Sequence, residues 1–192
     1  KLAAENFMQY YSKDFDMDAI VLRFTGVHGY GALMGFLTKD GSYTRTAAEW
    51  FIEKAVNGDP IEVWGDMNIR RDHVYIKDVI GAIEASLSAP AGTKGIYNVA
   101  SGVAHNQYED AVAIAKAFAT GKGVSKITLR PDLPGLTRGY CYSIEKIKRD
   151  MGWVPQYADL DKLYADYRTE WQRKTFHNYH FIKPEDKPVC FD

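Results

Sequence analysis

The sequence predicts an α/β fold, because short apolar stretches alternate with longer amphipathic stretches along the chain. Glycine and proline mark most boundaries between them, which supports a division into separate elements. The expected helices are 1–14, 44–57, 78–88, 108–119, 143–151 and about 159–174, and the expected strands are 18–24, 61–64, 71–76, 95–100 and 126–130.

The first elements follow from spacing and composition. Residues 1–14 carry apolar side chains at helical intervals, and 18–24 (DAIVLRF) is short, apolar and partly β-branched. The chain starts inside this helical pattern and without Met, so we interpret its beginning as a cut. Five glycines in residues 25–41 predict a long irregular loop, which in a compact domain is usually functional or mobile.

The middle of the chain shows clear stop and start signals. Gly58 ends the helix expected over 44–57, and 61–64 and 71–76 read as strands. Asp78 is expected to cap the helix that follows.

The last third repeats the alternation. An Ala-rich amphipathic helix is expected after strand 95–100, and a Pro/Gly loop over 131–140. Ser143 is expected to cap a helix that Gly152 ends, and Asp159 or Asp161 opens the last one.

The composition is that of an ordinary globular protein. Of 192 residues, 46% are hydrophobic and 26% charged, and the formal net charge is -1. Without a basic excess we expect no nucleic-acid partner, and the short apolar runs predict no membrane span. Two cysteines without framework spacing predict reduced thiols in a cytoplasmic protein; a disulfide between Cys141 and Cys190 stays open.

Two sequence patterns resemble a dinucleotide-binding turn and a metal site, but both lack the features that define such sites. The turn from Thr25 to Gly31 resembles the TGxxG opening of a dinucleotide-binding turn, but the glycine spacing is wrong and neither a helix nor an acidic strand end follows. His177, His180 and Cys190 lack a second pair at ligand spacing, so we expect no metal.

Four segments in one order carry more information. They are KLAAE at 1–5, LRFTGVHG at 22–29, GDPIEVWGD at 58–66 leading into RDHVYIKDV at 71–79, and YNVASG at 97–102 with MGWVP at 151–155. Together they resemble the extended short-chain dehydrogenase/reductase family, the nucleotide-sugar epimerases and dehydratases, over residues 1 to about 171.

The resemblance implies the C-terminal part of a Rossmann-type fold. Residues 1–29 would be a remnant of the cofactor domain, 30–174 mostly the nucleotide-sugar binding region, and 175–192 an irregular tail. The parent protein would bind NAD or NADP and a nucleotide diphosphate sugar, and form a homodimer. This chain alone would be inactive, because the glycine-rich turn and the catalytic Tyr are absent from it.

The resemblance also assigns catalytic and cofactor residues. Lys1 would be the lysine of the family's YxxxK motif, which holds the cofactor ribose and lowers the pKa of the Tyr three residues earlier. Phe24, Thr25 and His28 would face the cofactor; His28 is either a proton donor or polar lining. Gly26 stands where the family's Asn holds substrate phosphate, which puts that contact in doubt.

Arginines are the expected substrate ligands, since a guanidinium binds phosphate oxygens in a bidentate way. Arg71 is the expected clamp, although Arg70 could serve, and Asp72 is expected to orient or balance the two. Arg130 resembles a family arginine near the nucleotide, with Arg138 a weaker candidate in the same loop.

Aromatic residues are further candidates for the substrate site. Tyr43, Trp50 or Trp64 could stack on the base, although most such residues are core. The alternative to an enzyme part is a non-catalytic binding or regulatory protein on the same scaffold, which Gly26 suggests.

Overall fold

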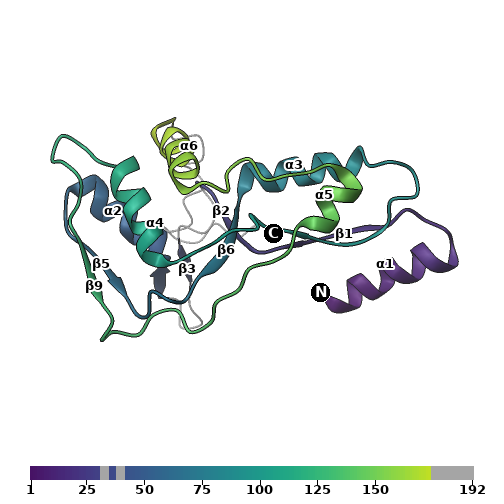
Figure 1. Ribbon diagram of the computed structural model, residues 1–192, viewed down its shortest axis with the longest axis horizontal. Coiled ribbons are helices and arrows are strands. Elements are labelled where there is room, and N and C mark those ends of the chain that lie inside the picture. Colours follow the sequence, from purple (N-terminus) through teal and green to yellow (C-terminus); the bar gives the residue numbers. More distant parts are fainter. Residues whose placement is uncertain (31–34, 38–41, 174–192) are drawn as a thin grey trace. The chain divides into compact units, whose positions relative to one another are not determined.

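The computed structural model describes residues 1–30, 35–37 and 42–173 (Figure 1). The chain forms two compact units, each built from three stretches. The first unit takes residues 1–27, 72–104 and 140–158, and the second takes 28–71, 105–139 and the chain from 159 onward. Helices and strands alternate along the chain, which confirms the α/β prediction.

The first unit contains a parallel strand pair with helices against it. Its elements are α1 (Leu2–Asp14), β1 (Ile20–Phe24), α3 (Ile76–Leu87), β7 (Gly95–Val99) and α5 (Glu145–Met151). Ile20 lies opposite Gly95, and Phe24 lies opposite Val99. Helix α1 buries none of its residues. The core comprises Val74, Val79, Ala82, Tyr97, Val99, Ile147 and Trp153.

The second unit also has a parallel pair, β5 (Ile61–Trp64) beside β9 (Ile127–Arg130). Ile61 and Val63 are buried whereas Glu62 and Trp64 are exposed, so one face of the pair is covered. In Figure 1 the helices α2 and α4 lie along this pair. The remaining elements are β3 (Gly35–Leu37), β4 (Tyr43–Arg45), α2 (Ala47–Asn57), α4 (Gln107–Ala117) and α6 (Leu160–Arg173).

A three-stranded sheet has the order β2 (Gly26–His28), β6 (Arg71–Tyr75), β8 (Ala104–His105). Strands β2 and β3 correct the prediction of an irregular loop over 25–41. Both are three residues long, and so short a strand forms through its partner rather than through local propensity.

The structure also corrects three helix starts. Helix α2 begins at Ala47, where the Thr46 hydroxyl accepts the Glu49 amide at 3.2 Å, and not at residue 44. Helix α3 begins at Ile76, so Asp78 lies inside its first turn and does not cap it. Ser143 lies one residue before the N-cap of α5, although its hydroxyl accepts the Glu145 amide at 3.4 Å.

The expected helix ends at Gly58 and Gly152 are confirmed. Both glycines have a positive φ, 72° and 67°, the left-handed conformation that ends many helices. Asp159 opens the last helix, because its side chain accepts the Lys162 amide at 2.8 Å.

Candidate functional site

The loop 131–139 of the second unit runs against the segment that joins β5 to β6. A Cβ atom on Gly135 would lie 2.5 Å from the Trp64 carbonyl oxygen, and one on Gly139 would lie 2.8 Å from that of Arg70. Arg71 Nε donates a 2.8 Å hydrogen bond to the Arg138 carbonyl. Only glycine permits such backbone approaches, so the loop is held at its middle and at its C-terminal end.

Trp64 and Arg130, two predicted substrate residues, lie side by side at the ends of the paired strands. Arg130 donates to Asp132 at 2.8 and 3.0 Å and to Glu62 at 3.3 Å, and Trp64 Nε1 donates to Glu62 at 3.3 Å. The hydrogen bonds to Asp132 raise the pKa of Arg130 and lower the pKa of Asp132. A phosphate at Arg130 would therefore compete with two carboxylates.

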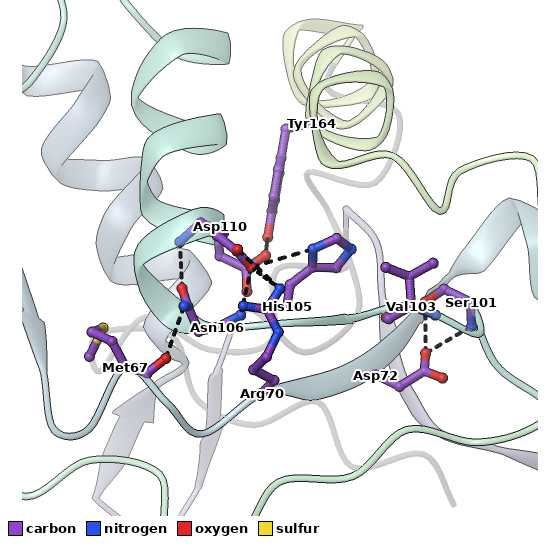
Figure 2. Close-up of polar contacts among 10 residues, drawn as sticks. Met67, Arg70, Asp72, Ser101, Val103, His105, Asn106, Asp110 and Tyr164 are labelled. Atoms are coloured by element: carbon purple, nitrogen blue, oxygen red, sulfur yellow. Dashed lines mark hydrogen bonds and ion pairs between the residues drawn. The ribbon is translucent and has the colours of Figure 1, made fainter.

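Arg70 and Glu109 form a bidentate ion pair, with Arg70 Nη2 at 2.8 and 3.0 Å from the two carboxylate oxygens. Glu109 also accepts the Asn106 amide at 3.0 Å, while the Asn106 side chain accepts the Glu109 amide at 2.9 Å. Figure 2 shows this group at the start of α4, together with the 2.9 Å bond from Asn106 Nδ2 to the Met67 carbonyl. The capping box of α4 thus holds residues 67–70.

Asp110 and Tyr164 connect α4 to α6. The Tyr164 hydroxyl donates to Asp110 at 2.8 Å (Figure 2). Burial raises the pKa of Asp110, opposed by the nearby His28 and by the Tyr164 hydrogen bond. Burial also raises the pKa of Tyr164 well above its usual value.

Asp72, in the first unit, is fully buried and joins three parts of that unit. Its carboxylate accepts the amides of Ser101 at 2.9 Å, Gly102 at 3.1 Å and Tyr142 at 3.2 Å, and the Ser101 hydroxyl at 2.7 Å. Figure 2 shows the bonds to Ser101. We expected Asp72 to orient or balance the neighbouring arginines; the hydrogen bonds described here instead hold the turn at 101–102 and the Tyr142 amide.

Asp78 has a comparable structural role. It is buried, and its carboxylate accepts the amides of Gln156 at 2.6 Å and Tyr157 at 3.0 Å. These bonds hold the segment after α5, which explains an acidic residue in the first turn of α3 better than capping does.

The predicted cofactor residues of the first unit lie at the starts and ends of elements. Lys1 is exposed at the N-cap position of α1, and Phe24 is 47% exposed at the carboxyl end of β1. The Thr25 hydroxyl donates to the Asp72 carbonyl at 2.7 Å, so it has a structural partner. Arg23, near the end of β1, pairs with Glu5, with its Nε 2.9 Å from Glu5 Oε1.

The other predicted residues are placed as follows. Gly26 is exposed in β2 and has no atom of the described chain within 4 Å of a Cβ position. His28 is half-buried in the second unit. The side chain of Tyr43 lies outside the described residues, and Trp50 stacks under Lys54, 4.9 Å from its Nζ.

Sequence reasoning missed Glu109, Asp110 and Tyr164. The spacing of Asn106 and Glu109 before an Ala-rich helix is a capping-box signal that could have located the start of α4. No local signal identifies Asp110, because its partner is 54 residues away.

A cleft of about 380 Å³ lies in the first unit, lined by α1, β1 and the start of β7. Its lining includes Met8, Lys13, Val21 and Lys94 and none of the predicted site residues. It therefore adds no support to the predicted residues.

Other classes of site find no support in residues 1–30, 35–37 and 42–173. No three His, Cys, Asp or Glu side chains gather there as metal ligands. His177, His180 and Cys190 lie outside these ranges, and Cys141 within them is a free thiol. None of the described helices has the length and apolar character needed to cross a bilayer.

Known proteins resemble this chain over most of its length. A model of the NAD dependent epimerase/dehydratase family matches residues 1–100. The low-salt glycan biosynthesis protein Agl12 of Haloferax volcanii is 31% identical over 116 residues, which are 60% of this chain and 36% of that protein. The dTDP-4-dehydro-6-deoxyglucose reductase of Escherichia coli is 24% identical over 177 residues, 88% of this chain and 51% of that protein.

Solved structures of epimerases and related proteins also resemble this chain. The Bordetella bronchiseptica enzyme WbmF in complex with NAD+ is 25% identical, with a TM-score of 0.65 over 91% of this chain and 51% of that one. The complex of WbmF with NAD+ and UDP gives a TM-score of 0.66 at 24% identity. The chain thus spans about half or less of the length of these proteins. Its fold is the α/β Rossmann-like fold of their family, and the chain belongs to the NAD dependent epimerase/dehydratase family.

Proposed function

We propose that this chain is the nucleotide-sugar-binding part of an NAD(P)-dependent nucleotide-sugar epimerase or dehydratase. Membership of the family and the likeness to an enzyme solved with NAD+ and UDP support the proposal. The C-terminal part of the family's fold, with the boundaries predicted above, accounts for a chain that spans about half of its relatives.

One observation carries most weight: Arg71 is anchored at the start of β6, where its Nε donates to the Arg138 carbonyl. A guanidinium held through one nitrogen keeps a fixed direction, and its terminal N–H groups suit bidentate contact with phosphate. Trp64 and Arg130 lie on one exposed strand end, where an aromatic face and a cation could meet a base and a phosphate. A phosphate at Arg130 would compete with the two carboxylates that pair with it, and Arg71 is the phosphate ligand that we propose.

The residues predicted to face the cofactor would form part of a dinucleotide site. Phe24 exposes its ring at the carboxyl end of a parallel strand, where Rossmann-type folds bind dinucleotides. The Lys1 ammonium would hold the ribose hydroxyls, and Thr25 fits less well because its hydroxyl bonds to Asp72. The bound nicotinamide would supply a hydride acceptor. The family's catalytic Tyr would precede Lys1 in the parent protein, and the dimer remains a prediction.

Ligand binding to the full-length protein tests this proposal. Thermal shifts are measured with UDP-, dTDP-, GDP- and ADP-linked sugars, with NAD+ and with NADP+. We expect stabilisation by one nucleotide sugar, and loss of that shift in Arg71→Ala. No shift with any nucleotide sugar would refute the proposal.

The alternative, a non-catalytic binding or regulatory protein, rests on Gly26 in place of the family's Asn. Stabilisation by NADP+ without any response to nucleotide sugars would favour it. Lys1→Ala separates the two further: in an enzyme it abolishes turnover and leaves nucleotide-sugar binding in place.

A further inference from the structure

We infer that Glu109 is a positioning residue that selects which of two consecutive arginines meets the substrate phosphates. This inference rests on the proposed function, which makes Arg71 the phosphate ligand. The sequence alone leaves Arg70 and Arg71 equivalent, and in the structure Arg71 begins β6 while Arg70 is the residue immediately before it.

The first step is geometric. Consecutive side chains of an extended chain point to opposite sides, so only one of the two arginines can face a given ligand. A shift of one residue in the strand would exchange them. Some contact must therefore fix which arginine lies on which side.

Glu109 makes that contact. Its two carboxylate oxygens bind Arg70 Nη2 at 2.8 and 3.0 Å, which draws Arg70 toward the start of α4 (Figure 2). The carboxylate is itself held, because it accepts the Asn106 amide at 3.0 Å as part of the capping box, in which Glu109 is the third residue of α4. Against the opposing effect of burial, the hydrogen bond from the Asn106 amide and then those from Arg70 lower the pKa of Glu109, so its carboxyl is ionised beside Arg70 at neutral pH.

Neighbouring contacts support the same register. Asn106 Nδ2 donates to the Met67 carbonyl at 2.9 Å, and Gly139 approaches the backbone of Arg70 too closely for any side chain. Because Arg70 is held at the start of α4, the Arg71 side chain lies toward the loop 131–139, where its Nε donates to the Arg138 carbonyl. The capping box of α4 thereby determines which arginine faces the ligand, although Glu109 does not contact the ligand itself.

The ion pair itself contributes little to folding, because Arg70 and Glu109 are 45% and 37% exposed. Its effect is expected in ligand affinity rather than in stability. Glu109→Gln is the informative variant: the amide oxygen can still accept the Asn106 amide, while the charge that holds Arg70 is gone.

The test is isothermal titration of the full-length protein with UDP, dTDP, GDP and ADP, using the tightest binder as the probe. Glu109→Gln is expected to weaken binding about three- to tenfold and to leave the unfolding midpoint in place. Arg70→Gln should weaken it by a similar factor, and the double variant by no more than either, because the two act as one unit. Glu109→Asp, which keeps the charge, should recover part of the loss.

Glu53→Gln is the matched control, since Glu53 pairs with Arg45 on the surface of α2 and should leave affinity unchanged. Arg71→Ala separates the two proposals and is expected to weaken binding by about tenfold or more. If Arg71→Ala has no effect or no nucleotide binds, the proposed function fails. If Arg71→Ala weakens binding while Glu109→Gln does not, or if the losses at Glu109 and Arg70 add, only the positioning role fails.

Discussion

Replacing Asp72 by alanine should destabilise the protein more than any exposed carboxylate variant. The carboxylate is fully buried and accepts three backbone amides and one hydroxyl, all between 2.7 and 3.2 Å. Alanine leaves the three amides without this partner, at about 1 kcal/mol each where water can reach them and more where it cannot, while the Ser101 hydroxyl can still donate to the Val103 carbonyl. We expect a loss of about 3–5 kcal/mol, a large part of the ~5–15 kcal/mol that stabilises a typical domain.

Urea unfolding followed by circular dichroism and by tryptophan fluorescence measures the loss, because Trp153 belongs to the core of the same unit. Asp72→Asn should lie in between, since its amide keeps one oxygen for the Ser101 donors but turns an NH2 group toward other donors. Asp16→Asn is the control: Asp16 is 94% exposed in its ion pair with Lys94, and asparagine also tolerates its positive φ of 50°, so the loss should stay within ~0.5 kcal/mol.

A loss below about 1 kcal/mol for Asp72→Ala would refute the reasoning. It would mean that water satisfies the Ser101 and Tyr142 amides at no cost, or that the turn at 101–102 does not depend on the carboxylate. The Cys141 thiol gives a second measure, because burial and the Asp72 charge both raise its pKa. Removing Asp72 should speed its alkylation at pH 8.

Three further changes test other parts of the structure. Gly26→Asn restores the side-chain amide of the family at a position where a side chain has room. The free energy of unfolding should stay within ~0.5 kcal/mol while the affinity for the nucleotide sugar rises. An unchanged affinity by titration would count against Gly26 as a substrate-site position. Because the pKa of Asp110 is raised in the folded protein, its carboxyl ionises at lower pH in the unfolded chain, and stability falls as pH rises from the unfolded to the folded pKa. Asp110→Asn still accepts a hydrogen bond from Tyr164, and its urea unfolding midpoints between pH 4 and 7 should lack this fall. Gly135→Ala places a Cβ atom 2.5 Å from the Trp64 carbonyl oxygen and should lower the free energy of unfolding by about 1–3 kcal/mol in urea. Gly121→Ala is the control, because a Cβ atom there meets open space and should not destabilise the protein. Equal effects of the two variants would refute the close approach at Gly135.

Local signals predicted the helices well and their first residues poorly. Gly58 and Gly152 stop their helices through a backbone conformation that the residue itself favours, so the sequence suffices. Asp78 looks like a cap by the same local rule, yet its carboxylate binds the amides of Gln156 and Tyr157, nearly eighty residues away. A rule that considers only neighbours cannot distinguish these two uses of an aspartate.

The candidate site divides in the same way. The resemblance supplied Arg130, and Trp64 was one of three aromatic candidates; their proximity comes from the register of β5 with β9, which no local pattern fixes. The choice between Arg70 and Arg71 likewise depends on Glu109, which packing places next to Arg70. The arginines of the proposed phosphate site remain a prediction from the sequence, whereas the contacts that orient them could not be predicted from local patterns.

The interleaving of the two units has a consequence for how the protein is made. The chain passes from one unit to the other five times, at 27/28, 71/72, 104/105, 139/140 and 158/159. On the ribosome, where many domains complete in order from the N-terminus, the first unit must wait for residue 158 before its last segment emerges. Strand β1 is synthesised about seventy residues before its partner β7, and its apolar edge has to remain unaggregated until then. No single proteolytic cut can release either unit intact, so a nick in a connecting segment would damage both.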